Sequence, residues 1–222
     1  MRMLATFEKG MRLRHIGHLD IMRAMQRALR RSGLPVSYSK GFNPHILLTF
    51  ASALSVGAVG KREIMEVSLE EEVAPEVFLA AMNKALPPEM QLTGARALPE
   101  GRGASMAMVR AARYRIELPA ETAERFAAVL PAYLAQGEII TERKTKSGVK
   151  PCDIRPLIYA LSVEDGALAA ELALTETESC KPAMLLATLS AFAGVEVPRA
   201  QVIRLALLGE NGEGERVPLE EL

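Results

Sequence analysis

The order of periodic segments along the chain constrains the fold more than any other feature of the sequence. Stretches in which apolar and polar residues alternate are typical of half-buried strands, and apolar residues three or four apart are typical of helices. They follow one another as strand, helix, strand, strand, helix, strand, once on each side of PEGRGAS at 99–105. We therefore expect an α+β protein of two tandem ferredoxin-like (βαββαβ) units, each an antiparallel sheet covered by helices.

The first half contains the clearest helix, at residues 18–32. Met22, Met25 and Leu29 form its apolar stripe, and Gly33 followed by Leu34-Pro35 is a typical helix stop. We expect the other elements of this half as strands at 1–8, 46–53, 62–69 and 91–97 and a helix at 75–86.

The second half opens with a strand at 113–118, whose apolar residues alternate with charged ones. Its other expected elements are helices at 121–135, bent at Pro131, and 182–193, strands at 154–163, 167–175 and 201–208, and an inserted basic segment at 138–150. The predicted domains are 1–98 for the N-terminal unit, 106–209 for the C-terminal unit, and 210–222 for a flexible acidic tail.

The charges of the chain balance in number but are segregated along the sequence. The chain has 27 Lys and Arg and 27 Asp and Glu, yet residues 1–62 carry 11 basic residues against two acids. Residues 63–100 carry two basic residues against eight acids. A net charge of zero therefore does not argue against a polyanionic partner.

The helix at 18–32 carries a row of arginines on the face away from its apolar stripe. Asp20, Arg23, Arg27 and either Arg30 or Arg31 share this face. Guanidinium groups match phosphate oxygens, so the row could follow a nucleic-acid backbone, continued by Lys9, Arg12, Arg14 and Lys40. The alternative is a solvated face partly paired with the acids of residues 63–100.

The stretch SYSKGFNPH at 37–45 is rich in turn-forming residues and holds an aromatic ring, Phe42, among Tyr38, Lys40 and His45. Such a loop can present backbone N–H groups and a stacking ring to an RNA base or a substrate. In the alternative interpretation the loop is a rigid turn and Phe42 is buried.

All three histidines lie between residues 15 and 45. His15, His18 and His45 could bind a metal, could act as general acid and base in RNA cleavage, or could line a basic cleft as structural residues. We favour the third interpretation and expect no metal.

The chain that leaves Gly33 is expected to run back toward the start of the helix and to bring residues 41–45 beside His15, His18 and Asp20. There we expect an anion site contacted by some of Arg14, His18, Lys40 and Asn43, with Phe42 partly exposed for stacking.

A second basic stretch, ERKTKSGVKPCDIRP at 142–156, resembles a mobile phosphate-contacting loop. Its basic residues are Arg143, Lys144, Lys146, Lys150 and Arg155, and Asp153 is placed to orient Arg155. The chain has no GxxxxGK[ST], GxSxG, HExxH or GxGxxG motif and no three-cysteine cluster. We therefore expect no cofactor, and any demanding chemistry would need a partner.

Two further features concern the setting of the protein. Cys152 and Cys180 form no CxxC pair and are expected to be reduced thiols. The chain has neither an apolar run of signal-peptide length at its start nor one long enough to span a membrane. We expect a soluble, cytoplasmic protein with no membrane partner.

Residues 9–57, together with KTKSGVKPCDIRP at 144–156, resemble the radical-SAM-linked protein family, a bacterial domain family of unknown function. The specific blocks are GHLD, RRSGLP and GFNPH. Members stand alone or are fused to a cobalamin-binding-type radical SAM protein, and their genes often neighbour those for a ribonuclease of the E/G type and ribosomal proteins. The resemblance implies a radical SAM partner and RNA, and it supplies no catalytic residues.

We therefore expect an RNA-binding accessory of a radical SAM enzyme that has no catalytic activity of its own, acting in tRNA or rRNA modification or processing. The alternatives are a metal-independent RNA endonuclease that uses His15, His18 or His45, and a protein-interaction module without nucleic acid. The expected nucleic-acid contacts are Arg12, Arg14, Arg23, Arg27, Arg30, Lys40, Phe42, Asn43, Lys144, Lys146, Lys150 and Arg155.

Overall fold

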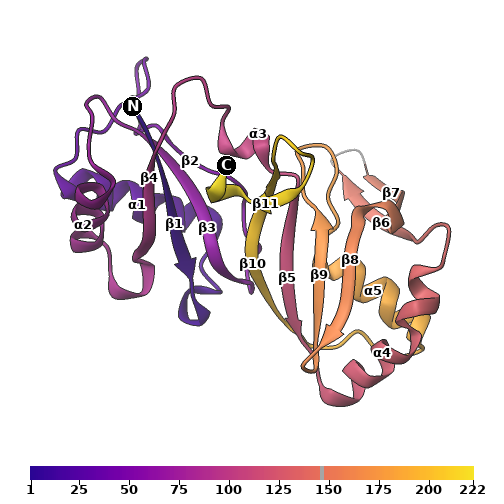
Figure 1. Ribbon diagram of the computed structural model, residues 1–222. Coiled ribbons are helices and arrows are strands. Elements are labelled where there is room, and N and C mark those ends of the chain that lie inside the picture. The colour runs from indigo at the N-terminus through magenta and orange to yellow at the C-terminus, as the bar shows by residue number, and fades with distance from the viewer. Residues whose placement is uncertain (146–147) are drawn as a thin grey trace. The chain divides into compact units, whose positions relative to one another are not determined.

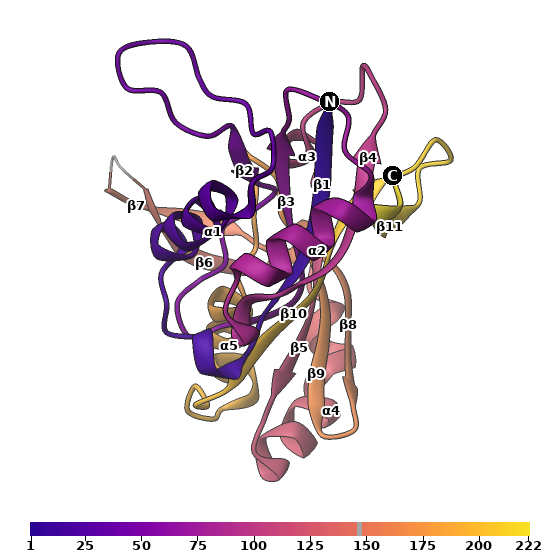
Figure 2. The same cartoon turned by 90° about the vertical axis from the view of Figure 1, so that its left-hand side faces the viewer.

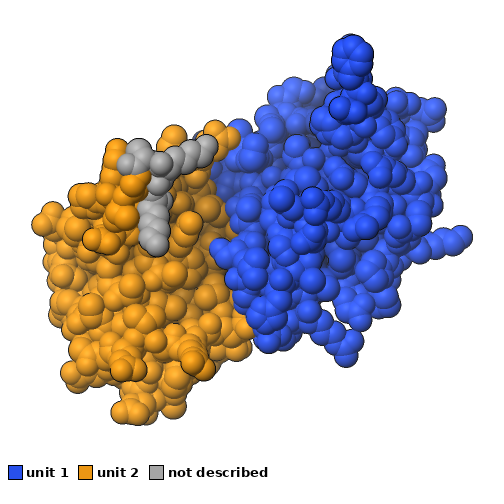
Figure 3. All heavy atoms as spheres, turned by 180° about the vertical axis from the view of Figure 1, so that it is seen from behind, with its two compact units in different colours: residues 1–109, 206–222 blue, residues 110–205 orange. Residues whose placement is uncertain are grey.

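The computed structural model describes residues 1–145 and 148–222. This part of the chain has a mixed α/β architecture of five α-helices and a large, mostly antiparallel sheet (Figure 1). It divides into two compact units, residues 1–109 with 206–222, and residues 110–205 (Figure 3). None of the helices in the described ranges is long and apolar enough to cross a membrane.

Unit 1 is built around a sheet with the strand order β4-β1-β3-β2, in which neighbouring strands are antiparallel. Its elements in chain order are β1 (Arg2–Lys9), α1 (His18–Ser32), β2 (Leu48–Phe50), β3 (Val59–Ser68), α2 (Pro75–Ala85), β4 (Leu92–Leu98), α3 (Ser105–Met108) and β11 (Arg216–Pro218).

The core of unit 1 lies between this sheet and the two long helices α1 and α2, which cover one face of it (Figure 2). Strand side chains alternate between faces, so Met3, Ala5 and Phe7 of β1 point to the helices. Met25 of α1 and Phe78 of α2 are fully buried against them. The opposite face carries the residues between them, Arg2, Leu4 and Thr6.

Unit 2 has the strand order β10-β5-β9-β8 and a separate two-stranded hairpin, β6-β7. Its elements in chain order are β5 (Ala111–Glu117), α4 (Ala120–Leu134), β6 (Ile140–Thr145), β7 (Gly148–Asp153), β8 (Ile158–Glu164), β9 (Ala167–Ala173), α5 (Pro182–Ala193) and β10 (Gln201–Glu210), of which residues 201–205 belong to unit 2. Helix α4 continues through Pro131 to Leu134.

Two helices, α1 and α5, have the predicted bounds, 18–32 and 182–193. At the end of α1, Gly33 takes the left-handed conformation (φ 74°) that the stop signal implies. The bounds of the strands differ more from the predicted ones. The strand predicted at 46–53 is confined to Leu48–Phe50, and the one predicted from 154 begins at Ile158 because residues 155–157 form a 3₁₀ turn.

The basic segment at 138–150 falls largely within the hairpin β6-β7. The end of the chain, predicted as a flexible tail at 210–222, contains β11, which pairs with β10, and the buried Leu219. The compact units therefore group the chain differently from the predicted boundaries 1–98, 106–209 and 210–222, which stay a prediction about domains.

Candidate nucleic-acid interface

The arginine row of α1 is exposed on one face of the helix. Arg23, Arg27 and Arg30 are exposed, and the opposite face buries Ile21, Met25, Ala28 and Leu29. This division arises because positions three or four apart share a face of a helix. Helix geometry places the three arginines about 6 Å and about 4.5 Å apart along the axis.

The contacts of the row are local and exposed. Arg23 pairs with Asp20 on its own helix at 3.1 Å, and Arg27 Nε donates to the carbonyl of Arg23 at 3.3 Å. Arg30 has no hydrogen-bond or ion-pair partner within 1–145 and 148–222. Exposed pairs contribute little to stability, so a phosphate could displace them at low cost.

The exposure of the row also fits the alternative of a solvated face, and Arg12, which continues the row before the helix, pairs with Glu89. Within α1 the described arginines form no ion pair with the acids of residues 63–100. The only row member in an ion pair there is Arg23, and its partner is Asp20. Arg31 is instead structural, because its guanidinium donates to the carbonyl of Ala85, the last residue of α2, at 2.8 Å. Arg30 therefore completes the row, and Arg31 braces α1 against α2.

The loop at 38–45 is a closed stem with an exposed tip. Tyr38 and Ile46 form a β-bridge, and Ser39 N donates to the carbonyl of His45 at 2.8 Å. The Ser39 hydroxyl and His45 Nδ1 lie 2.8 Å apart, and His45 N also donates to that hydroxyl at 3.1 Å. The loop, between α1 and β2, projects from unit 1 (Figure 2). Its position leaves the tip open to a partner.

The tip, residues 40–44, is exposed throughout, and the ring of Phe42 is fully exposed. The alternative in which Phe42 is buried is therefore wrong. An aromatic ring without intramolecular packing is available for base stacking, and Lys40 and Asn43 lie on either side of it in the sequence.

The expected convergence of this loop with the start of α1 is not found. The chain leaving Gly33 does not run back along the helix, because Val36 bridges Leu69 and Ser37 N donates to the carbonyl of Ser68 at 2.9 Å. These contacts hold the loop at the end of β3, beside the end of α1. His18 lies at the other end of α1, stacked on Phe50.

The separation of His45 from His18 follows from the extended chain that leads from His45 to Phe50, the ring on which His18 stacks. His45 is five residues from Phe50, which corresponds to about 16 Å of extended chain. The anion site expected from Arg14, His18, Lys40 and Asn43 together is therefore corrected, and these residues belong to two places. Lys40 and Asn43 lie at the exposed tip of the loop that follows α1.

Arg12, Arg14 and His15 lie in the turn between β1 and α1, near the start of the helix. Arg12 pairs with Glu89 at 3.2 Å, and Arg14 Nη1 donates to the carbonyl of Met11 at 2.9 Å. His15 is exposed. No group of three or more His, Cys, Asp or Glu side chains in the described ranges is arranged to hold a metal ion.

Two charged side chains beside the start of α1 are buried, so Lys9 does not continue the exposed arginine row as expected, and Glu63 was not singled out in the sequence. Lys9 and Glu63 are each 3% exposed and line, with His18 and Ser52, a small cavity of about 20 Å³. A cavity of this size holds about one water molecule and no substrate. The burial of Lys9 could have been predicted from the sequence, because the alternation of β1 places it on the same face as Met3, Ala5 and Phe7.

In the second basic stretch, Lys150 is exposed on β7, opposite Arg143 of β6. Arg143 Nη2 donates to the hydroxyl and the carbonyl of Ser179 at 2.7 and 3.1 Å, so it holds the hairpin to the residues before α5. Lys146 and the side chain of Lys144 lie outside what the structure describes. The described residues of this stretch, expected to form a mobile loop, instead form most of the hairpin β6-β7.

The expected role of Asp153 is corrected by its contacts. Asp153 Oδ1 accepts from the backbone N–H groups of Ile139 and Arg155 at 2.8 and 2.9 Å, and its carboxylate does not orient the guanidinium. Arg155 Nε donates to the carbonyl of Leu134, the last residue of α4, at 2.9 Å. Arg155 therefore caps α4.

Residues 2–184 match the model of a bacterial family described as "Uncharacterized protein conserved in bacteria (DUF2344)". This match covers more than three quarters of the 222 residues. The chain belongs to this family. None of the curated proteins matches it.

In this DUF2344 chain the matched range includes α1, the loop at 38–45 and the hairpin β6-β7, and it ends near the start of α5. The features that make up the candidate interface therefore lie inside the part of the chain that defines the family.

Proposed function

We propose that this protein is an RNA-binding accessory protein that works with a radical SAM enzyme in tRNA or rRNA modification or processing. One observation carries the proposal. The guanidinium groups of Arg23, Arg27 and Arg30 are exposed along one face of α1, and the loop that follows this helix presents a fully exposed Phe42.

The two parts of this surface suit the two chemical parts of a single-stranded RNA. Guanidinium groups pair with phosphate oxygens and supply affinity without regard to sequence. A ring that projects from the surface stacks on an unpaired base, an interaction of about 1–3 kcal/mol per base. Because the loop follows the end of the helix in the chain, we propose that one strand contacts both.

The finer description of the fold belongs to the same proposal. The orders β4-β1-β3-β2 and β10-β5-β9-β8 are each the order expected of a βαββαβ unit, and they support two tandem ferredoxin-like units. In unit 2 the exposed Lys150 adds positive charge on the hairpin. Its contribution to RNA binding is independent of the α1 surface.

The proposal of a radical SAM partner rests on a sequence resemblance and not on the geometry of the surface. The blocks GHLD, RRSGLP and GFNPH resemble the radical-SAM-linked protein family, whose members are found beside or fused to radical SAM proteins. The chemistry would then belong to the partner, and this chain would present the RNA to it. The cytoplasm is the proposed location.

A second candidate function, a metal-independent RNA endonuclease, is favoured by the position of His18. It lines a cavity with Lys9, Ser52 and Glu63, groups that can exchange protons with a reacting hydroxyl. The size of the cavity and the distance of His18 from the loop count against it as the main function.

Incubation of the purified chain with total cellular RNA separates these functions. We expect RNA to be retained intact, with affinity that falls as salt is raised. Cleavage that leaves 2′,3′-cyclic phosphate ends, and that is lost in His18→Ala, would replace the accessory with the nuclease. A chain that retains no RNA even at low salt would contradict both and leave a protein-interaction module.

A further inference from the structure

Three arginines and one carboxylate lie on the face of the unit 1 sheet that α1 and α2 do not cover. Glu66 of β3 and Arg96 of β4 both pair in register with Leu4 of β1, which lies between them. Leu4 belongs to the face opposite Met3 and Ala5, which point to the helices. Arg2 of β1 and Arg102, just after β4, complete the cluster.

The carboxylate is already fully engaged. Glu66 pairs with Arg2 at 3.4 Å and with Arg102 at 3.3 Å, and its side chain is 8% exposed. It also accepts hydrogen bonds from the backbone N–H of Ser105, at 2.7 Å, and from the Ser105 hydroxyl. This one carboxylate thus serves two guanidinium groups, and Arg96, whose charge acts on Arg102, forms no ion pair among the described residues.

Three guanidinium nitrogens in this cluster lack acceptors. Arg96 Nε, Arg96 Nη2 and Arg102 Nη2 are closed off from solvent and have no hydrogen-bond partner among the described residues. The side chain of Arg102 is only 5% exposed, although its Nε reaches the main-chain oxygen of Leu222 at 3.3 Å. A buried donor without an acceptor costs about 1–3 kcal/mol, and more when it is charged.

The electrostatics of the cluster agree with this shortage of acceptors. Burial lowers the pKa of Arg102, and the positive charges of Arg96 and Arg2 lower it further, while Glu66 opposes the change. The protonated guanidinium is therefore less well compensated than it would be in water. An additional negative charge at this place would stabilise the folded chain.

We propose that Arg2, Arg96 and Arg102 form a binding site for a small tetrahedral oxyanion of the phosphate class. Planar guanidinium forks bind such oxygens through paired, charge-assisted hydrogen bonds. The 30% exposure of the Arg2 side chain gives the site a route from solvent. The burial of the unpartnered nitrogens favours a free anion over the backbone of an RNA.

This site is distinct from the arginine row, because the cluster lies on the sheet face that α1 does not cover. A small anion bound here would stabilise unit 1 and couple its stability to the concentration of that anion. The protein would then respond to phosphate independently of RNA.

Calorimetric titration of sodium phosphate into the full chain tests the site, at constant ionic strength and with sodium chloride as the comparison. We expect saturable binding of phosphate and of sulfate, but not of chloride. Arg96→Met should raise the Kd for phosphate by about tenfold or more, since it removes charge-assisted hydrogen bonds. Arg113→Met, an exposed arginine of unit 2 paired with Glu171, is the matched control and should keep the wild-type Kd.

Glu66→Gln should change the affinity for phosphate in the opposite direction to Arg96→Met. Removing the carboxylate leaves the cluster more positive, so phosphate should bind more tightly even though the midpoint of thermal unfolding without phosphate falls. Phosphate that binds the wild type no better than chloride would overturn the proposal, as would unchanged phosphate binding by a folded Arg96→Met. Loss of RNA affinity in Arg96→Met, with no phosphate bound by the wild type, would assign the cluster to RNA and also overturn it.

Discussion

The imidazole of His18 lies edge-on to the ring of Phe50, with the ring centroids 5.1 Å apart and the planes at 66°. Phe50 makes a second edge contact with Phe7, at 5.5 Å, so the three rings form one cluster between α1, β1 and β2. This contact fixes the start of α1 at a distance from the loop that holds His45. It gives His18 a structural role that RNA binding does not require.

His18→Ala should therefore lower the free energy of unfolding by about 0.5–1.5 kcal/mol, the range for an aromatic pair. His18→Phe keeps an edge contact and should lose less. Urea unfolding of the two variants measures this difference. RNA affinity should be unchanged in both, and a marked loss of affinity in His18→Phe would show that the imidazole itself contacts RNA.

Phe42→Ala should weaken binding of single-stranded RNA by about 1–3 kcal/mol, the contribution of one stacked base. The thermal midpoint should not change, because the ring is fully exposed. Phe42→Trp retains a stacking surface and serves as the control. Fluorescence polarisation with a labelled RNA reports the affinity, and equal binding by Phe42→Ala and wild type would remove the ring from the interface.

Arg155→Ala should destabilise unit 2 by about 1.5–3 kcal/mol, the range for a hydrogen bond to a charged group, because its guanidinium caps the end of α4 at Leu134. Since the guanidinium serves the fold, the dependence of RNA affinity on salt should stay as in the wild type. Urea unfolding and a salt titration separate the two roles. A lower salt dependence without lost stability would return Arg155 to the RNA contacts.

The free energy of unfolding should fall as pH rises above about 8.5, because of the buried thiol of Cys180. Burial raises the pKa of the Cys180 thiol to about 12; the Cys152 thiol raises it too, and Arg143 opposes the rise. In the unfolded chain the thiol loses its proton near pH 8.5–9, so above that range the folded state binds more protons. Its stabilising contribution is complete below about pH 8.5 and is lost as pH rises toward 12.

Urea unfolding between pH 8 and about pH 10.5 measures this effect, with reducing agent present. The wild type should lose up to about 1.4 kcal/mol per pH unit above pH 9 from this thiol. Cys180→Ala should show a shallower decline and Cys152→Ala the full one. Parallel curves for wild type and Cys180→Ala would contradict the assigned cause.

Local signals predicted the elements that depend on local physics. The amphipathic period and Gly33 define α1, which has the predicted bounds. Helix α5 also has the predicted bounds. The arginine row follows from the same period. Phe42 could be placed in a loop, but whether its ring was buried depended on the path of that loop.

Features that depend on chain path were predicted less well. The convergence of His18 and His45 failed because the bridge between Val36 and Leu69, distant in sequence, determines where the loop leaves α1. The capping role of Arg155 depends on the end of α4, 21 residues earlier in the chain. The cluster around Glu66 joins four segments, so no local pattern of charges indicates it.

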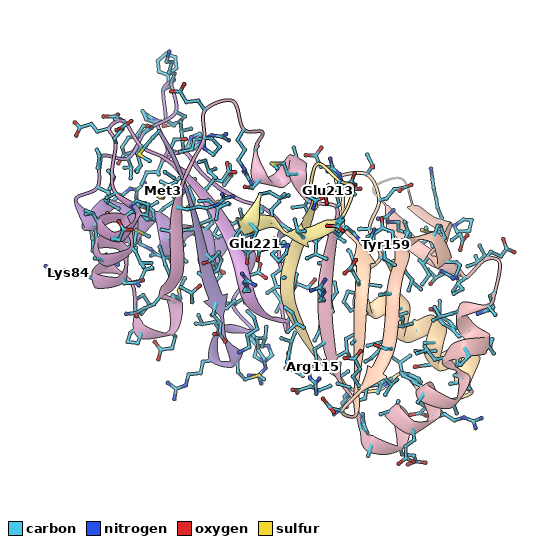
Figure 4. All side chains as sticks on the ribbon, viewed as in Figure 1. Met3, Lys84, Arg115, Tyr159, Glu213 and Glu221 are labelled. Carbon is cyan, nitrogen blue, oxygen red and sulfur yellow. The ribbon has the colours of Figure 1, made fainter. Side chains whose placement is uncertain are left out.

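The central claim, that the arginine row contacts RNA phosphates, is tested most directly by the slope of log affinity against log salt for a single-stranded RNA. Arg27→Ala and Arg30→Ala should each lower the slope by about 0.7, since each removes one phosphate contact. Lys84→Ala is the control, because Lys84 is exposed on α2 and points away from unit 1 (Figure 4). Its slope should equal that of the wild type. A wild-type slope in both Arg27→Ala and Arg30→Ala would contradict the claim.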